Sequence, residues 1–133
     1  MTGVQTCALP ISPISESVLT GMGLAASACG YRPIVNWRSV TFCFVAMDQI
    51  INQASKLRYM SGGQVDFPVT YRCGVGTGDN MAAQHSQSPY SMWMHMAGIK
   101  VILPSTPADA KGDRKSTRLN SSHIPLSRMP SSA

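Results

Sequence analysis

Helix-like and strand-like segments alternate along most of this chain, and the connections between them are too short to hold further elements. The apolar pattern predicts helices over residues 16–29, 44–57 and 89–96 and from Pro107 onward, and strands over residues 32–37, 67–72 and 99–104. Strands that are joined through helices run parallel in one sheet. The alternation therefore predicts an α/β layered fold with a largely parallel sheet.

Two of the expected helices carry apolar residues at helical spacing. In residues 16–29 the face expected to be buried holds Val18, Met22, Ala25 and Cys29. In residues 44–57 it holds Phe44, Met47, Ile51, Ala54 and Leu57. The spacing of Gly21 and Ala25 would also let another helix approach the first of these segments closely. Both helices are therefore expected to pack against the sheet by these faces.

The two ends of the chain encode each other on opposite DNA strands. Residues 2–11, TGVQTCALPI, can be written in codons whose reverse complement reads DRKSTRLNSS, which is the sequence of residues 113–122. Such an inverted repeat resembles the adapters that are ligated to DNA fragments for short-read sequencing. We therefore expect residues 1–11 and 113–133 to be adapter-derived and non-native, and the second of these segments to be disordered. Residues 12–112 are expected to be a partial domain cut from a longer reading frame.

The positive charge of the chain is concentrated in its tail. Of the formal net charge of +5, residues 113–133 contribute four basic and one acidic side chain, and residues 12–112 contribute seven basic and five acidic ones. Without the tail, the charge gives no reason to expect a nucleic-acid partner. The sequence has no apolar run of membrane-spanning length, and its first residues lack the pattern of a signal peptide. We expect an intracellular protein without a nucleic-acid or membrane partner.

The four cysteines form no CxxC pair and no metal-ligand spacing with the three histidines. Reduced, mostly buried thiols are therefore expected at Cys7, Cys29, Cys43 and Cys73. His95 lies among three methionines, Met92, Met94 and Met96, and is expected to belong to a packed helix rather than to a metal site.

Glu16 stands at the start of the first expected helix, directly after the residues PIS. The pattern alone favours a carboxylate that the helix dipole stabilises behind a capping Ser15. The alternative is a carboxyl group that binds a ligand at the edge of the sheet, where open α/β folds bind their ligands.

His85 lies in a polar stretch, AAQHSQSP, before the helix of residues 89–96. A lone histidine is most often a structural group, but these polar neighbours also suit an acid or a base. The glycine-rich loop of residues 73–79, CGVGTGD, lacks the lysine and the spacing of a phosphate-binding loop. A nucleophile pair of Cys73 and His85 is rejected because nothing marks an oxyanion hole or an orienting group.

Four stretches, taken in order, resemble one family: PISE, DQIINQASKLRYMSGGQ, AAQHSQSP and GIKVILPSTPADAKG. They are similar to the beta subunit of the thiamine-diphosphate-dependent 2-oxoacid dehydrogenases of the pyruvate, branched-chain and acetoin types. This family belongs to the transketolase-like superfamily, and the resemblance extends over residues 13–112. It implies a partial three-layer thiamine-diphosphate-binding fold, the pyrimidine module.

The resemblance implies a role for three residues. Glu16 would hydrogen-bond a nitrogen of the cofactor's aminopyrimidine ring and promote its imino form, and Phe42 would pack on that ring. His85 would line the active-site channel and donate a proton or stabilise charge during acyl transfer. The implied reaction is oxidative decarboxylation of a 2-oxo acid, followed by transfer of the acyl group to lipoyl.

The resemblance also implies the partners. An alpha subunit would hold the diphosphate and its Mg2+ in a heterotetramer, so no metal site is expected in this chain, and a lipoyl-bearing acyltransferase would accept the product. The fragment alone is expected to be inactive. The parent protein would be cytoplasmic in a bacterium and located in the mitochondrial matrix in a eukaryote.

Two alternatives stay open. The first is the pyrimidine domain of another transketolase-like enzyme, such as transketolase or a deoxyxylulose-phosphate synthase, against which the stretch AAQHSQSP argues. The second is a non-catalytic paralogue that acts in subunit interaction, against which the presence of both Glu16 and His85 argues.

Overall fold

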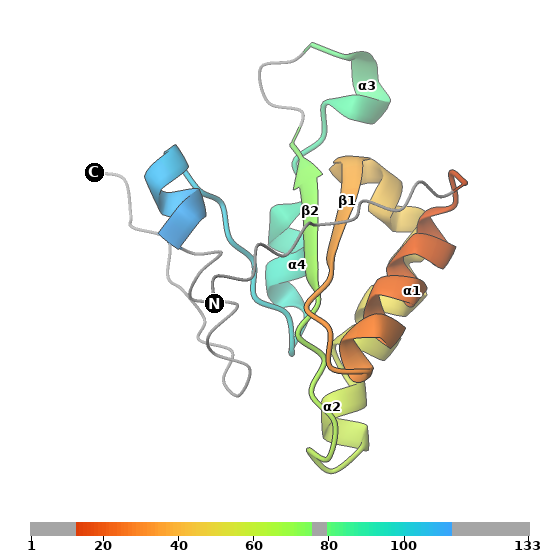
Figure 1. Ribbon diagram of the computed structural model, residues 1–133. Helices are drawn as coiled ribbons and strands as arrows, with labels where there is room; N and C mark the ends of the chain where they lie inside the picture. The colour runs from red at the N-terminus through yellow and green to blue at the C-terminus, as the bar shows by residue number, and fades with distance from the viewer. Residues whose placement is uncertain (1–12, 76–79, 113–133) are drawn as a thin grey trace, which may run out of the picture.

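The computed structural model describes residues 13–75 and 80–112 (Figure 1). Its elements are, in order, α1 (Glu16–Ala28), β1 (Ile34–Ser39), the 3-10 helix η1 (Val40–Ala46), the π-helix η2 (Asp48–Ala54), α2 (Leu57–Met60), β2 (Thr70–Gly74), α3 (Ala82–His85) and α4 (Tyr90–His95). Residues 107–112 are also helical. The adapter-like ends and most of the glycine-rich loop lie outside the described residues.

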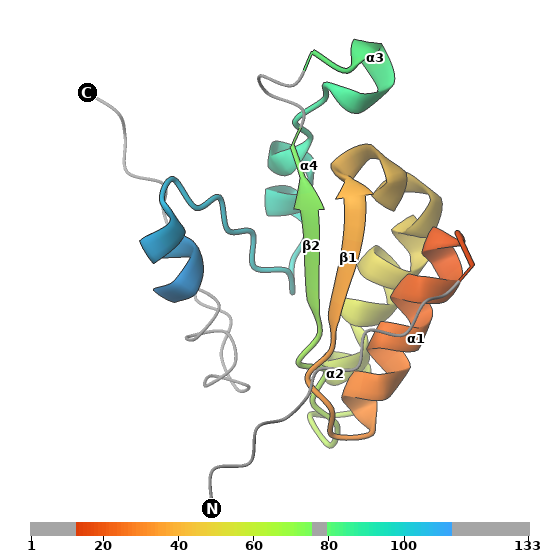
Figure 2. The ribbon, with the colours of Figure 1, turned by 45° about the horizontal axis from the view of Figure 1, so that its top comes forward.

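The two strands pair in parallel. Ile34 lies opposite Thr70 at one end and Ser39 opposite Gly74 at the other, with a shift of register between Trp37 and Ser39. Figures 1 and 2 show that α1 runs in the direction opposite to the strands, and that α1 and the helical segment after β1 lie on the same side of the sheet. The expectation of an α/β fold with a parallel sheet is confirmed.

The core lies between the sheet and these helices. Along β1, buried and exposed residues alternate strictly, as in a strand that packs by one face. The buried cluster consists of Val35, Trp37, Val40, Cys43, Ala46, Ile50 and Trp93. Strand β1 and the helices that follow it therefore form most of the core, and α4 adds one large side chain, Trp93.

The expected third strand does not form. Residues 99–104 form neither a helix nor a strand, and the described part of the protein has only the β1–β2 sheet. Ile99 and Val101 nevertheless pack against the core cluster. The apolar pattern thus identified a segment that contacts the core, but a strand also requires a ladder of hydrogen bonds to a neighbour, which the pattern does not show.

The buried face of α1 also differs from the expectation. Val18 and Met22 are 56% and 60% exposed, and Ala25 and Cys29 are exposed as well. The residues that α1 buries are Thr20, Gly23, Leu24 and Ser27. The prediction of the buried face of α1 from its hydrophobic residues is therefore wrong.

Close packing against β1 explains which residues α1 buries. A Cβ atom on Gly23 would lie 2.3 Å from Cγ2 of Val35, so a side chain at this position would overlap with the strand. The buried hydroxyls of Thr20 and Ser27 donate hydrogen bonds of 2.6 Å to the carbonyls of Glu16 and Leu24, which satisfies them within the helix. Apart from Leu24, the contact face thus consists of small residues, two of which have internally bonded hydroxyls.

The helix expected over residues 44–57 changes type along its length. It begins as the 3-10 helix η1, continues as the π-helix η2, and is followed after a turn by α2. Within η1 the buried residues recur every third position, at Val40, Cys43 and Ala46, because a 3-10 helix has three residues per turn. Phe44 is consequently 38% exposed, contrary to the expectation. Met47 and Ile51 pack against the core as expected.

Candidate functional site

The three residues expected to form a site lie on elements that meet at one edge of the sheet. Helix η1, which carries Phe42, follows β1 directly, and α3, which carries His85, follows β2. Figures 1 and 2 show η1, α3 and the first turn of α1 at the end of the molecule toward which both strand arrows point. This is the carboxyl edge, where open α/β sheets bind ligands.

Glu16 is the first residue of α1 and is half-buried. Its carboxylate forms no hydrogen bond or ion pair with any other described residue. Ser15 occupies the capping position, but its side chain makes no capping hydrogen bond. The backbone carbonyl of Ser15 accepts a hydrogen bond of 2.9 Å from the N–H of Leu19. Within residues 13–75 and 80–112, the Glu16 carboxylate therefore has no partner that a ligand would have to displace.

Ser17 fixes the first turn of α1 and was not singled out from the sequence. Its hydroxyl donates a hydrogen bond of 2.8 Å to the backbone carbonyl of Val45, in η1. This contact ties the residue next to Glu16 to the helix that carries Phe42. A serine at the start of a helix has several common roles, so no sequence signal distinguished this one.

Phe42 and His85 contact each other directly. Their ring centroids are 5.2 Å apart and their planes meet at 89°, an edge-to-face arrangement. Both side chains are half-buried. The structure therefore brings two of the three expected residues into contact and places the third on the neighbouring first turn of α1.

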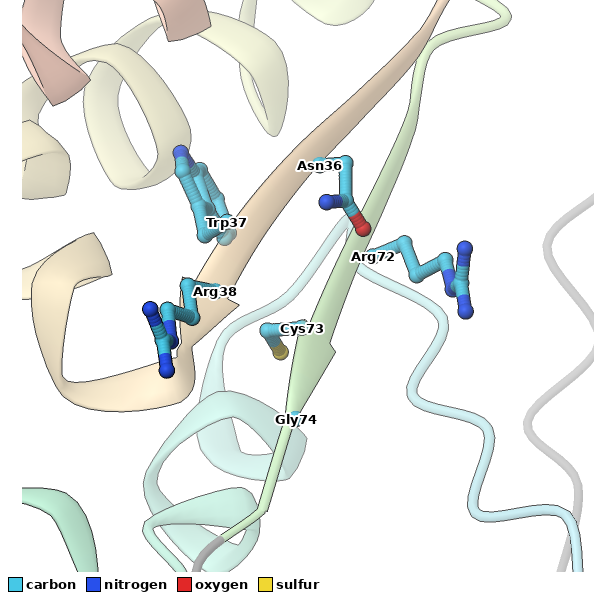
Figure 3. A pocket seen from close by; sticks show the side chains of 6 residues that line it. All are labelled: Asn36, Trp37, Arg38, Arg72, Cys73 and Gly74. Carbon is cyan, nitrogen blue, oxygen red and sulfur yellow. The ribbon is translucent and has the colours of Figure 1, made fainter. Parts of the chain in front are cut away.

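A separate shallow hollow of about 530 Å³ lies over the ends of the two strands. Figure 3 shows the side chains that line it, Asn36, Trp37, Arg38, Arg72, Cys73 and Gly74. The guanidinium groups of Arg38 and Arg72 lie on opposite sides of the strand pair, so they do not converge on one ligand. The hollow contains none of the three expected site residues.

Two aromatic residues stack beneath this edge on the core side of the sheet. The rings of Trp37 and Tyr71 are 5.0 Å apart and nearly parallel, at 7°. The indole N–H of Trp37 and the hydroxyl of Tyr71 are buried without a hydrogen-bond partner among the described residues. Burial without a hydrogen bond disfavours a charged form strongly, and it raises the pKa of Tyr71 to about 12.

The described cysteines are free thiols in different environments. Cys43 is buried, Cys73 is half-buried and Cys29 is exposed, so the expectation of buried thiols holds for the first two and not for the third. Burial, and secondarily the neighbouring Cys73, raise the pKa of Cys43 to about 12. Burial also raises the pKa of Cys73. Because the thiolate is the reactive form, burial lowers the fraction of the reactive form at both Cys43 and Cys73.

The sequence profile described as the pyrimidine-binding domain of transketolase matches residues 11–120. The chain belongs to this family. Membership in the transketolase-like pyrimidine-binding family accounts for the parallel sheet, and it implies dependence on thiamine diphosphate. It also agrees with the expected superfamily.

Relatives of this pyrimidine-binding domain include three kinds of beta subunit. Over 101 residues the chain is 48% identical to the acetoin:2,6-dichlorophenolindophenol oxidoreductase subunit beta of Cupriavidus necator and 46% identical to the pyruvate dehydrogenase E1 component subunit beta of Rhizobium meliloti. It is 39% identical to the 2-oxoisovalerate dehydrogenase subunit beta of Bacillus subtilis. The alignments cover 76% of this chain but 30%, 22% and 31% of those relatives. The chain thus spans less than a third of each.

The residues at the edge of the sheet suit the aminopyrimidine part of thiamine diphosphate. Glu16 offers a half-buried carboxylate that has no partner among the described residues, and a carboxyl group can share a proton with a ring nitrogen. Phe42 offers an aromatic ring in the adjacent helix, which can pack against a flat heterocycle.

Across residues 13–75 and 80–112, no helix is long and apolar enough to cross a bilayer.

The buried thiol and phenol of the pyrimidine-binding domain predict a loss of stability at high pH. The native pKa values of Cys43 and Tyr71, both about 12, lie above the ordinary values of 9.0 and 10.0. The unfolded chain therefore loses these protons first as the pH rises. Their contribution to stability is complete below pH 9 and declines between about pH 9 and 12, by up to about 1.4 kcal/mol per pH unit for each group.

Urea unfolding at pH 7, 9 and 10.5, followed by tryptophan fluorescence, measures this decline. Tyr71→Phe is expected to make the decline between pH 9 and 10.5 shallower, because one titrating group is removed. Tyr59→Phe is the matched control, since Tyr59 is 88% exposed. An equal slope in the two variants would contradict the assignment to Tyr71.

Proposed function

We propose that the parent protein is the beta subunit of the decarboxylating component of a 2-oxoacid dehydrogenase, and that this chain supplies part of the pyrimidine half of its thiamine diphosphate site. The observation that carries the proposal is the meeting of the α1 start, η1 and α3 at the carboxyl edge of the sheet, with Phe42 and His85 in contact. The identity to beta subunits of three such enzymes supports it.

Glu16 is proposed to bind the aminopyrimidine ring. Its carboxylate has no hydrogen-bond or ion-pair partner among the described residues and lies at the start of α1. A carboxyl group can form a strong hydrogen bond with a ring nitrogen by sharing a proton with it. Glu16 would therefore both orient the ring and hold or share a proton at that nitrogen.

Phe42 and His85, which contact each other, are proposed to act side by side at the reacting centre. Phe42 supplies an apolar wall that limits water at the bound ring. His85 donates a proton or stabilises developing charge as the acyl group leaves for lipoyl. Bound thiamine diphosphate itself supplies the electron sink that allows a 2-oxo acid to lose carbon dioxide.

The remaining parts of the enzyme are proposed to come from outside this chain. The names of the relatives, subunit beta, support an alpha subunit as partner. We propose that it holds the diphosphate and Mg2+ in a heterotetramer, and that a lipoyl-bearing acyltransferase accepts the product. This chain by itself would be inactive. Pyruvate dehydrogenase beta subunits of this kind occur in the bacterium Rhizobium meliloti and, with a mitochondrial label, in rice, which supports a cytoplasmic location in a bacterium or the matrix in a eukaryote.

The ends of the chain are proposed to be adapter-derived. The complementarity of residues 2–11 and 113–122 supports this, and the aligned length of 101 residues equals that of residues 12–112. The family profile reaches residue 120. Sequencing across codons 12 and 112 in the source genome decides the matter, because native codons that continue into residues 1–11 and 113–133 would refute an adapter origin.

The proposed function is tested with the full-length gene. Its product, co-expressed with the neighbouring alpha subunit, is expected to decarboxylate a 2-oxo acid in the presence of thiamine diphosphate and Mg2+, with either protein alone inactive. Pyruvate and 2-oxoisovalerate are the 2-oxo acids to compare, and acetoin, which has no carboxyl group to lose, is assayed for cleavage of its carbon–carbon bond. An assembled complex that binds the cofactor but acts on none of them, and instead transfers two-carbon units between sugar phosphates, would favour a transketolase-like enzyme.

A further inference from the structure

The contact between Phe42 and His85 joins a well-anchored helix to a weakly supported one. Helix α3 is four residues long, and a single helical turn has little stability of its own because nucleation is unfavourable. The chain also enters α3 with positive φ angles at two non-glycine residues, Asn80 at 49° and Ala82 at 60°. Such conformations are disfavoured for residues with a Cβ atom. Contacts with the rest of the protein must therefore hold α3 in place.

His85 is the side chain of α3 best placed to make that contact. Ala82, Ala83 and Gln84 are exposed, whereas His85 is half-buried. Helix η1 is the element against which α3 packs, and the Phe42 ring there lies 5.2 Å from the imidazole. The contact between His85 and Phe42 thus holds α3 against η1.

The η1 side of the contact is fixed in the core. Val40, Cys43 and Ala46 are buried on one side of η1, and the hydroxyls of Ser39 and Thr41 are hydrogen-bonded to each other at 3.0 Å. Residues on both sides of Phe42 are therefore either buried in the core or hydrogen-bonded. Of the two partners, Phe42 belongs to the rigid platform and His85 to the element that depends on it.

We propose that Phe42 is a positioning residue for His85: its ring holds the imidazole, and with it α3, at the carboxyl edge of the sheet. An edge-to-face aromatic pair favours the docked arrangement roughly 2- to 10-fold. This role is additional to the apolar wall that Phe42 would offer the cofactor. Its consequence for acyl transfer rests on the proposed function, whereas the docking itself does not.

The docking is tested in this chain without cofactor. In Phe42→Leu the ring is lost and most of the apolar volume is kept, so the imidazole resonances of His85 in a proton–carbon NMR spectrum are expected to move as the ring current of Phe42 disappears. Modification of His85 by diethyl pyrocarbonate is expected to become roughly 2- to 10-fold faster. In Phe42→Tyr, which keeps the ring, both readouts are expected to stay as in the parent chain.

Two internal references make the test specific. Phe44→Leu is the matched control, because Phe44 lies in the same helix, is 38% exposed and has no ring contact with His85 among the described residues. His95, exposed on α4, reports the general reactivity of histidine in each variant. His85→Ala should in turn move the aromatic resonances of Phe42, which tests the contact without changing η1.

The outcomes separate the inference from the proposed function. Unchanged His85 resonances and reactivity in Phe42→Leu, or equal changes in Phe44→Leu, would overturn the positioning role. If instead the His85 signals depend on Phe42 but the assembled full-length enzyme with Phe42→Leu transfers acyl groups to lipoyl at the parent rate, the docking stands and its place in acyl transfer is refuted.

Discussion

Replacing Glu16 by glutamine in the full-length beta subunit, numbered as in this chain, is expected to lower decarboxylation by the assembled enzyme by about 100-fold or more. Glutamine keeps the size of the side chain but removes the charge, so it cannot hold or share the proton of the cofactor ring. A positioned acid–base group typically contributes about 100- to 10,000-fold to a rate. Steady-state decarboxylation of the 2-oxo acid, at saturating thiamine diphosphate and Mg2+, measures the effect.

Asp48→Asn is the matched control for this substitution. Asp48 is an exposed acidic residue at the start of η2, so its replacement removes one negative charge at a helix start without touching the proposed site. Its variant is expected to keep the parent rate. Full activity of Glu16→Gln in a properly assembled complex would show that Glu16 only stabilises the helix N-terminus, which is the alternative that the sequence pattern favours by itself.

Replacing Gly98 by alanine is expected to destabilise the chain by about 3 kcal/mol. Gly98 has a φ of +92°, and a Cβ there would lie 2.3 Å from the backbone carbonyl oxygen of Ser55. Overpacking and an unfavourable φ each cost about 1 to 3 kcal/mol, and a backbone atom cannot rotate away as a side chain can. The amine of Lys56 also donates a hydrogen bond of 2.9 Å to the carbonyl of Ala97, which holds the two segments together. Urea unfolding followed by tryptophan fluorescence measures the loss.

Gly62→Ala separates the two causes. Gly62 has a φ of +64°, but a Cβ there meets no atom within 4 Å. Its replacement is expected to cost only the conformational part, about 1 kcal/mol. Equal losses at Gly62 and Gly98 would mean that the close approach of residues 97–98 to Ser55 does not exist in solution.

The sequence predicted the order of elements well because hydrophobic period and chain breakers are local signals. The helix expected at 16–29 is observed as α1, the one expected at 89–96 as α4, and two of the three expected strands are observed, shifted by two or three residues. The family resemblance, confirmed by the match over residues 11–120, rested on local motifs as well. These features depend on residues that are neighbours along the chain.

The buried faces were predicted less well, for two physical reasons. On α1, hydrophobicity pointed to Val18 and Met22, but the fit of Gly23 against Val35 turned the small and hydroxyl-bearing face inward. After β1, a 3-10 helix replaced the expected α-helix, and the change from 3.6 to 3.0 residues per turn left Phe44 partly exposed. Steric fit to a neighbouring element is not encoded in the period of a single segment.

For the candidate site, the sequence alone determined which residue types are present, namely a carboxylate at a helix start, an aromatic residue ahead of the DQI motif and a histidine in AAQHSQSP. Only the tertiary structure decided that the Phe42 ring meets His85 edge to face and that Ser17 ties the first turn of α1 to η1. Local sequence sets the chemistry and the helix or strand that carries it. The parallel pairing of β1 and β2 brings segments that are far apart in the sequence to one edge of the sheet. No local sequence pattern specifies that these segments lie close together.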